Sequence, residues 1–514
     1  MALLAGCSAG GDEPVVDEDD LTSLTARQRL LSFEGVVYVD KGASNTKILE
    51  AAHKQTQTAF GALLAQDVAA RSREMQNVDP ASFKKREVVV VDPNVASDAG
   101  KPMLEVKYTY NDEAVIPIAL ARHTNLSLAL LARGSQHMID TVVAACTKND
   151  KEARDEARDG LLWYSFNPAK ASCRAAIDKE QRVIDADTSK LTDKRAMVAK
   201  SRVERTFLPT AMRLARAATA TNATYPEYDK LFSGGVEPGV LTIALVNGRL
   251  AHDRTEANKD DGYYEWMDAL GVVFETHPEF KLTKIEPAVD VSTVTVEGKR
   301  LENLGFKDFI QWKVYGTGFP AGLSAAGKNE LQAKIANKLD GKWVTFEKKV
   351  KVAIGDAAPN DFTLRLFTMF GADENPEPHR LAVRKADVVI YNGHSYIGYG
   401  PLDPDNFRPS SFPGSYQLFW FDSCVSYNYY EKDFFTLKQG GSKTLDIITN
   451  GLEAPEYKSG EANGKFIAKF LDGSMPSYQT LLALARDTDS LRVVDGEIDN
   501  QYHPSRVKVR LSAP

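Results

Sequence analysis

Two short apolar runs in the last third of the sequence constrain the fold more than any other feature. They are residues 388–391 (VVIY) and 418–421 (LFWF). Runs of this length, rich in β-branched and aromatic residues, predict strands that are buried on both faces of a sheet. Each run leads into a short polar turn with a reactive side chain, His394 after the first and Cys424 after the second. We therefore expect an α/β fold built around this pair of strands.

His394 and Cys424 form a candidate catalytic pair. If the two strands are parallel neighbours, both side chains emerge at the carboxyl edge of one sheet, where open α/β sheets bind their ligands. A thiol beside an imidazole is the minimal unit of cysteine nucleophile chemistry, because the base creates the thiolate that attacks. The structural alternatives are a histidine satisfied at a strand end and a cysteine buried as a small apolar residue. Their placement after two successive buried strands favours the catalytic pair.

The residues around this pair resemble those of the caspase-like cysteine peptidases, which include caspases, legumains and gingipains. The similar segments are Gly393-His394-Ser395 and Asp422-Ser423-Cys424. The spacing of the histidine and the cysteine is most similar to that of the gingipains. The resemblance implies that residues 306–514 form a caspase-like α/β/α sandwich with a mostly parallel sheet. It also implies a peptidase in which His394 is the base and Cys424 the nucleophile.

Neighbouring residues supply the other parts that such a site needs. The N–H of Cys424 and an amide from Gly393 or Ser395 would bind the oxyanion. Asp422 shares a strand face with Cys424, so it is a candidate for binding a basic side chain of a substrate; a structural acceptor for loop amides is the equal alternative. The helix expected after Cys424 would lower the pKa of the thiol.

The composition limits the partners. The chain has 514 residues, of which 43% are hydrophobic and 26% charged, as in ordinary globular proteins of several domains. A net charge of −7 gives no support for a nucleic-acid groove or a patch for anionic membranes. No apolar run reaches the roughly 20 residues that span a bilayer. The resemblance to the cysteine peptidases implies a peptide or protein substrate as the partner.

The remaining cysteines point to an exported protein. Cys7 ends the segment Leu-Leu-Ala-Gly-Cys, which resembles the bacterial lipobox, and the acidic residues after it are typical of a flexible tether. The resemblance implies a lipid anchor on the bacterial cell envelope, in the periplasm or at the cell surface; a chance match is the alternative. In an oxidising compartment we expect a disulfide between Cys146 and Cys173, with two buried thiols as the alternative. Cys424 then remains as the unpaired thiol.

We expect four parts: a partial lipoprotein signal and acidic tether (1–20), an α+β domain with a helical second half (21–225), a small α+β domain (226–305) and the caspase-like domain (306–514). Within the first domain, strands are predicted at 33–39, 88–91 and 104–110. Helical structure is predicted at 45–74, at 174–217 and from 126 onward.

No metal site or cofactor is expected. The eight histidines are scattered, and the sequence lacks the zinc-binding His-Glu-x-x-His pattern, a phosphate loop and Gly-x-Ser-x-Gly. An acidic loop with Asp253, Glu256, Asp260 and Asp261 is a weak candidate for calcium. The irregular spacing of these residues favours a loop that caps the following helix.

The sequence thus predicts an exported, membrane-tethered cysteine peptidase. The Cys424 thiolate, formed with the help of His394, would attack a peptide carbonyl, and water would hydrolyse the acyl-enzyme. The alternative is a non-catalytic surface lipoprotein whose caspase-like domain serves binding or assembly. The residues before 306 show no further site, which favours this alternative.

Overall fold

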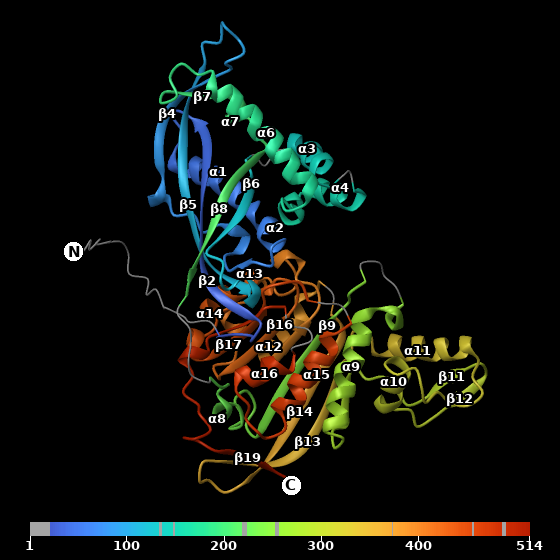
Figure 1. Cartoon of the computed structure of the whole chain (residues 1–514). Coiled ribbons are helices and arrows are strands. Elements are labelled where there is room, and N and C mark those ends of the chain that lie inside the picture. Colours follow the sequence, from blue (N-terminus) through green and yellow to red (C-terminus); the bar gives the residue numbers. More distant parts are fainter. Residues whose placement is uncertain are drawn as a thin grey trace.

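The computed structural model describes residues 21–132, 136–147, 150–217, 224–251, 256–372, 374–454, 457–485 and 490–514. These residues fold around two large sheets (Figure 1). The seven-stranded sheet lies in the N-terminal part, at the top of the view, and the ten-stranded sheet in the C-terminal part below it.

The ten-stranded sheet has a parallel centre and antiparallel edges. Its strands, in spatial order, are β1 (Leu21–Thr22), β18 (Arg492–Asp495), β17 (Leu445–Asn450), β16 (Gln417–Asp422), β15 (Val388–Asn392), β9 (Val240–Gly248), β14 (Asn360–Ala372), β13 (Trp343–Ile354) and β10 (Lys281–Glu286), and β19 (Val509–Ser512) pairs with β13. Strands β14, β9, β15, β16 and β17 run parallel to one another. The general α/β prediction is therefore confirmed, and so are the two predicted strands β15 and β16, which are buried along their whole length.

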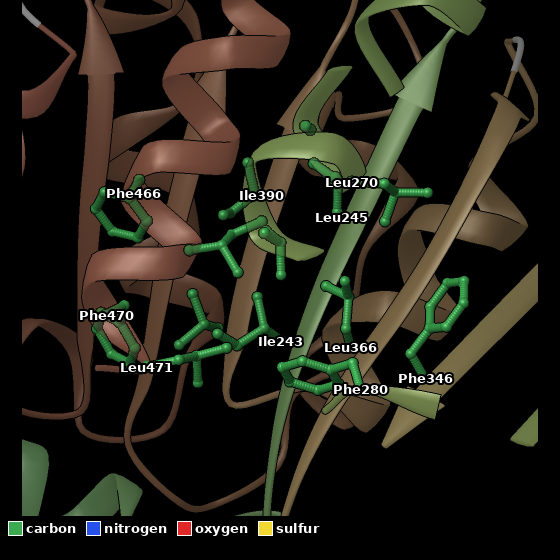
Figure 2. Packing of buried hydrophobic residues seen from close by; sticks show 14 of the residues in the cluster. Ile243, Leu245, Leu270, Phe280, Phe346, Leu366, Ile390, Phe466, Phe470 and Leu471 are labelled. Atoms are coloured by element: carbon green, nitrogen blue, oxygen red, sulfur yellow. The ribbon is translucent and has the colours of Figure 1, made fainter. Parts of the chain in front are cut away.

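Helices cover both faces of this sheet because alternate residues of its strands point to opposite sides. On one face lie α9 (Asp261–Thr276), α15 (Ser459–Phe470) and α16 (Tyr478–Leu484), and on the other α12 (Pro376–Lys385), α13 (Ser426–Tyr429) and α14 (Glu431–Leu437). Figure 2 shows the core of the first face, with Ile243, Leu245, Leu366 and Ile390 of the sheet packed among Leu270 of α9 and Phe466 and Phe470 of α15.

Residues 226–305 share this sheet with the C-terminal residues instead of forming a sheet of their own. Strand β9 lies between β14 and β15, in the middle of the sheet. The predicted boundary at 305 therefore falls within one folded unit. A smaller subdomain follows β10 and contains the hairpin of β11 (Val294–Val296) and β12 (Lys299–Leu301), then α10 (Phe306–Lys313) and α11 (Ala325–Leu339). The short helix α8 (Tyr228–Leu231) precedes β9.

The N-terminal sheet is more strand-rich than predicted. Its order is β6 (Asn125–Leu131), β8 (Phe207–Arg216), β2 (Ala26–Asp40), β5 (Lys101–Pro117), β4 (Lys84–Val91) and β7 (Met197–Ala199), and β3 (Ala69–Ala70) pairs with β5. Its helices are α1 (Asn45–Gln57), α2 (Ala59–Leu64), α3 (Gln136–Thr147), α4 (Lys151–Arg158), α5 (Leu162–Ser165), α6 (Ala171–Ser189) and α7 (Lys200–Val203).

Three helix predictions in this region were wrong. The run that starts at 126 is strand β6, because it pairs along its length with β8, and β8 itself replaces the end of the helix predicted at 174–217. The single helix predicted at 45–74 is two helices that meet at Thr58, followed by strand β3. Tertiary pairing outweighed helical propensity at these places.

The predicted disulfide is confirmed. Cys146 of α3 and Cys173 of α6 are bonded, at a sequence separation of 27, and they tie the helical part of the N-terminal domain together. Among the described residues, no helix combines the length and the apolar character required to cross a membrane.

Candidate functional site

The strand register brings the two reactive turns to the same edge of the sheet. Strands β15 and β16 are parallel neighbours, and Asn392 pairs with Asp422 at their carboxyl ends. His394 lies two residues beyond the first of these, and Cys424 two residues beyond the second. Because neighbouring strands lie about 4.8 Å apart, the two turns begin side by side.

Two tyrosine hydroxyls hold the histidine turn, one of them from the cysteine side of the site. The hydroxyl of Tyr430, which follows α13, donates to the carbonyl oxygen of Ser395 over 2.5 Å. The hydroxyl of Tyr391, on β15, donates to the carbonyl oxygen of His394 over 2.8 Å. The first bond crosses directly from the cysteine side of the site to the histidine side.

A backbone carbonyl fixes the orientation of the His394 ring. The Nε2 atom lies 3.0 Å from the carbonyl oxygen of Leu250, in the segment after β9. A carbonyl oxygen only accepts hydrogen bonds, so Nε2 carries the proton, and in the neutral ring Nδ1 is the basic nitrogen. This is the tautomer in which Nδ1 can take up a proton.

Asp260 in turn positions Leu250. Its buried carboxylate accepts hydrogen bonds from the N–H groups of Leu250 at 3.0 Å, Ala251 at 3.2 Å and Gly262 at 2.8 Å. The last of these bonds caps the N-terminus of α9. Asp260 therefore has the capping role that the sequence favoured over a calcium ligand. Asp253, from the same predicted loop, lies outside the described residues, and the described residues hold no cluster of three or more metal-ligating side chains.

The Cys424 thiol is half-buried and needs a base. Burial raises its pKa, and the charges of Glu453 and Asp422 raise it further, although the N–H of Ala454 donates a hydrogen bond that lowers it. We expected the following helix to lower this pKa, but the net shift is upward, because α13 has only four residues and burial is the largest effect. The sulfur is protonated at neutral pH until another group removes the proton.

Left-handed backbone conformations flank both reactive residues. Val425, directly after Cys424, has φ 51° and ψ 31°, and Ile397, three residues after His394, has φ 54° and ψ 34°. β-Branched residues rarely adopt this region, and each such residue costs on the order of 1–3 kcal/mol. Conformations of this kind cluster at functional sites, where the surrounding structure holds them in place.

A row of buried polar side chains crosses the sheet just below the two turns. It consists of register partners at the carboxyl ends of the parallel strands and at the start of β18, namely Asn247, Asn392, Asp422, Asn450 and Arg492. Sequence reasoning missed this row, although four apolar strands with Asn or Asp at or next to their carboxyl end were a visible signal. Their sequences are VLTIALVNG, VVIYN, QLFWFD and LDIITN.

Asp422 belongs to this row and is fully buried. Its carboxylate accepts from the side-chain amides of Asn450 and Asn463, both at 2.8 Å, and pairs with Arg492 at 3.5 Å. Arg492 is also buried and lies over the ring of Trp420. The basic group that Asp422 meets is therefore one of the chain's own, which corresponds to the structural role weighed against substrate binding.

Glu265 of α9 anchors the histidine strand in the same way. Its carboxylate accepts from the Asn392 amide at 2.6 Å and from the N–H of Tyr457 at 2.9 Å. Burial raises the pKa of Glu265 to about 8, and the nearby charge of Asp422 contributes. A glutamate in the middle of an otherwise apolar helix face is the signal that could have revealed it.

The two residues proposed for oxyanion support have distinct roles in the packing. A Cβ on Gly393 would lie 2.5 Å from the Tyr391 hydroxyl, so only glycine fits against that ring. Ser395 is buried, and its carbonyl accepts from both Tyr430 and the N–H of Gly398. Both residues lie in the histidine turn, where an oxyanion donor would be needed.

The N-terminal domain packs against the site. The Asn428 amide on α13 donates to the carbonyl oxygens of Ala70 at 2.9 Å and Ser72 at 2.8 Å. Arg73 donates to the Gly398 carbonyl at 2.9 Å, and buried Arg71 pairs with Asp495 of β18 at 3.1 Å. The chain between β3 and η1 (Arg73–Met75) therefore joins the two sheets directly beside the reactive turns.

An acidic pocket lies next to Cys424, between the two domains. It has a volume of about 500 Å³, and its lining includes Asp67, Glu156, Tyr164, Leu452 and Glu453. The Tyr164 hydroxyl donates to Glu453 over 3.3 Å, and both side chains lie within electrostatic reach of the Cys424 sulfur.

Comparison with family models, curated proteins and solved structures finds no match to this chain.

Proposed function

We propose that this chain is a cysteine peptidase with Cys424 as nucleophile and His394 as base. The observation that carries the proposal is the hydrogen bond from His394 Nε2 to the Leu250 carbonyl. It leaves Nδ1 as the basic nitrogen, on the sheet edge that also carries Cys424. Because burial keeps the Cys424 sulfur protonated, a neighbouring base is what the chemistry requires.

The proposed reaction has two halves. His394 takes the proton of the Cys424 thiol, the sulfur bonds to the carbonyl carbon of the peptide, and the C–N bond breaks as His394 returns the proton to the leaving amine. Water, deprotonated by the same ring, then hydrolyses the thioester and frees Cys424. The N–H of Cys424 and an amide of Gly393 or Ser395 are the proposed donors to the oxyanion.

The fold and the cellular setting form part of the same proposal. A parallel centre that carries both turns, with helices on both faces, supports a caspase-like sandwich in the C-terminal part. The Cys146–Cys173 disulfide supports maturation in an oxidising compartment. Lipidation of Cys7, which lies outside the described residues, would tether the protein to the bacterial envelope.

A non-catalytic role in binding or assembly is the second candidate. The observation that favours it is the cover over the site: Ala70, Ser72 and Arg73 of the N-terminal domain bond to the segments after Cys424 and His394. A domain held this closely beside the pair limits the access of an extended substrate. The two candidates differ in whether the thiol performs chemistry.

Peptide cleavage distinguishes them. The purified chain and its Cys424→Ala variant are incubated with a mixture of peptides, and the fragments are identified by mass spectrometry. The peptidase proposal predicts fragments with the wild type that are absent with Cys424→Ala. Peptides with and without lysine or arginine test whether the acidic pocket selects basic side chains. Equal fragments from both proteins, or none from either, would favour the non-catalytic role.

A further inference from the structure

A second pocket lies in the N-terminal domain, away from the two reactive turns. It has a volume of about 370 Å³ and opens between β2, α1, β5 and the end of α7. These elements lie in the upper domain of Figure 1. The volume is within the roughly 300–1,000 Å³ typical of small-molecule sites. Nothing in the proposed peptidase chemistry uses this pocket.

Three cationic side chains line this pocket: Lys54, Arg202 and Arg205. Arg205 is only 7% exposed, and its guanidinium donates to two neutral acceptors, the Phe207 carbonyl and the Gln181 side chain. Arg202 bonds to the Tyr38 hydroxyl and lies close enough to Arg205 for their charges to repel.

No carboxylate forms an ion pair with these three cations among the described residues. The nearest acidic side chains are already engaged. Glu180 accepts from the N–H groups of Thr206 and Phe207 at 2.7 and 2.9 Å, and Glu105 pairs with Arg86 at 2.9 Å. The charge of Glu180 still acts on Arg205, whereas the partly buried Arg202 has no such carboxylate partner among the described residues, so the arginine side of the pocket offers cationic donors to an anion.

The rest of the lining is largely apolar. Val36, Ala51, Met103, Ala132 and Val203 contribute hydrocarbon surface beside the two arginines. Gln55 and Tyr38 are the uncharged polar residues of the wall. The Gln55 amide already bonds to both backbone groups of Val36 and to the Tyr108 hydroxyl, and the Tyr38 hydroxyl donates to Glu105 at 3.0 Å. The cationic side chains thus supply the polar recognition, and the apolar part of the lining suits a short hydrocarbon group.

We propose that this pocket binds a small organic carboxylate with a short apolar body. The guanidinium groups of Arg202 and Arg205 hold the carboxylate, because their planar donors match its two oxygens. The apolar body rests on Val36, Met103 and Val203. The proposal is independent of the peptidase proposal, since none of these residues contacts the reactive turns.

Calorimetry with the full chain tests this site. The probes are hexanoate, its neutral match 1-hexanol, and inorganic phosphate. Hexanoate is expected to bind with a Kd near or below about 1 mM, and hexanol at least about tenfold more weakly, because it lacks the charge. Phosphate, which lacks an apolar body, is expected to bind more weakly than hexanoate.

Variants test the contribution of the cationic side chains and that of the apolar lining separately. Arg202→Gln should weaken hexanoate binding about tenfold, whereas Arg202→Lys should retain most of it. Ala51→Leu, which narrows the pocket without a change of charge, should also weaken it. The matched control Arg195→Gln removes the same charge from an exposed position and should leave binding unchanged. Thermal unfolding of each variant checks that it folds.

Four outcomes would overturn the proposal. They are no binding of hexanoate, equal binding of hexanoate and hexanol, phosphate binding as tight as that of hexanoate, and equal binding by the wild type and a folded Arg202→Gln variant.

Discussion

The Nε2 atom of His394 donates a hydrogen bond to the carbonyl oxygen of Leu250 across 3.0 Å. This bond joins the turn after β15 to the segment after β9, the next strand of the sheet. Asp260 holds Leu250 through its N–H, so a chain of three residues sets the direction of the imidazole ring. The tautomer of His394 therefore depends on a backbone atom whose position depends on a buried carboxylate.

Replacement of Asp260 should affect both stability and reactivity. Asp260→Ala removes the acceptor for three N–H groups, so we expect the free energy of unfolding to fall by at least about 2 kcal/mol. Because Leu250 is then released, alkylation of the Cys424 thiol should also slow. The control is Ser324→Ala, which removes the cap of α11 in the subdomain after β10. It should cost about 1 kcal/mol and leave the alkylation rate unchanged; equal effects of the two variants would contradict this account.

Asp422 should prove to be a structural residue. Asp422→Ala leaves the buried Arg492 without its carboxylate, so we expect a loss of about 3–5 kcal/mol in urea denaturation. The double variant Asp422→Ala/Arg492→Met should lose less than the sum of the single changes. If stability were unchanged and only the KM for peptides with basic side chains rose, Asp422 would instead bind substrate.

Glu265 should make the stability depend on pH. Its pKa rises from 4.5 to about 8 on folding, so the folded state holds the proton more tightly than the unfolded state. The contribution of Glu265 to stability is then greatest below about pH 4.5 and falls as the pH rises towards 8, by at most about 1.4 kcal/mol per pH unit.

The variant Glu265→Gln carries a neutral amide at this position, which does not ionise between about pH 4 and 8. The difference in unfolding free energy between the wild type and Glu265→Gln, measured in urea from about pH 5 to about pH 8, should therefore change steadily in favour of the variant. Both proteins contain the other buried acids, such as Asp446, whose pKa burial raises to about 7, so the titration of those acids cancels in this difference. A difference that stays constant over this range would show that Glu265 is already ionised in the folded protein.

The disulfide should stabilise the N-terminal domain. A bridge that closes a 27-residue separation contributes about 3 kcal/mol. Reduction with dithiothreitol should thus lower the thermal midpoint of the wild type. The variant Cys146→Ser/Cys173→Ser should start at the lower midpoint and not respond to the reductant, whereas Cys424→Ser should respond like the wild type. If reduction leaves the thermal midpoint of the wild type unchanged, the helices around the bridge are stable without the disulfide.

The sequence predicted the parts of the site that apolar patterning determines. Strands β15 and β16 were evident because short, fully apolar runs with β-branched and aromatic residues are typical of strands buried in the middle of a sheet. The turns after them, with His394 and Cys424, followed from the same pattern. The disulfide was inferable because Cys146 and Cys173 were the remaining pair in a chain of the expected exported type.

The sequence did not predict the parts of the site that depend on contacts between distant segments, because such contacts do not require a particular type of residue. The acceptor for His394 is a backbone carbonyl, which every residue has, so nothing in the sequence singles out Leu250. The pKa of Cys424 depends on burial and on the charge of Glu453, which lies on a different segment of the chain. Strand β6 was mistaken for a helix because its pairing with β8 is decided by tertiary structure.

The alkylation rate of Cys424 tests the central claim most directly. Iodoacetamide is small enough to reach a half-buried thiol, and mass spectrometry of the Cys424 peptide gives the rate. We predict that near neutral pH the wild type reacts at least about tenfold faster than His394→Ala, because the imidazole removes the thiol proton. The control His123→Ala, which changes an exposed histidine, should react like the wild type. Equal rates for the wild type and His394→Ala would contradict the proposed pairing of these two residues.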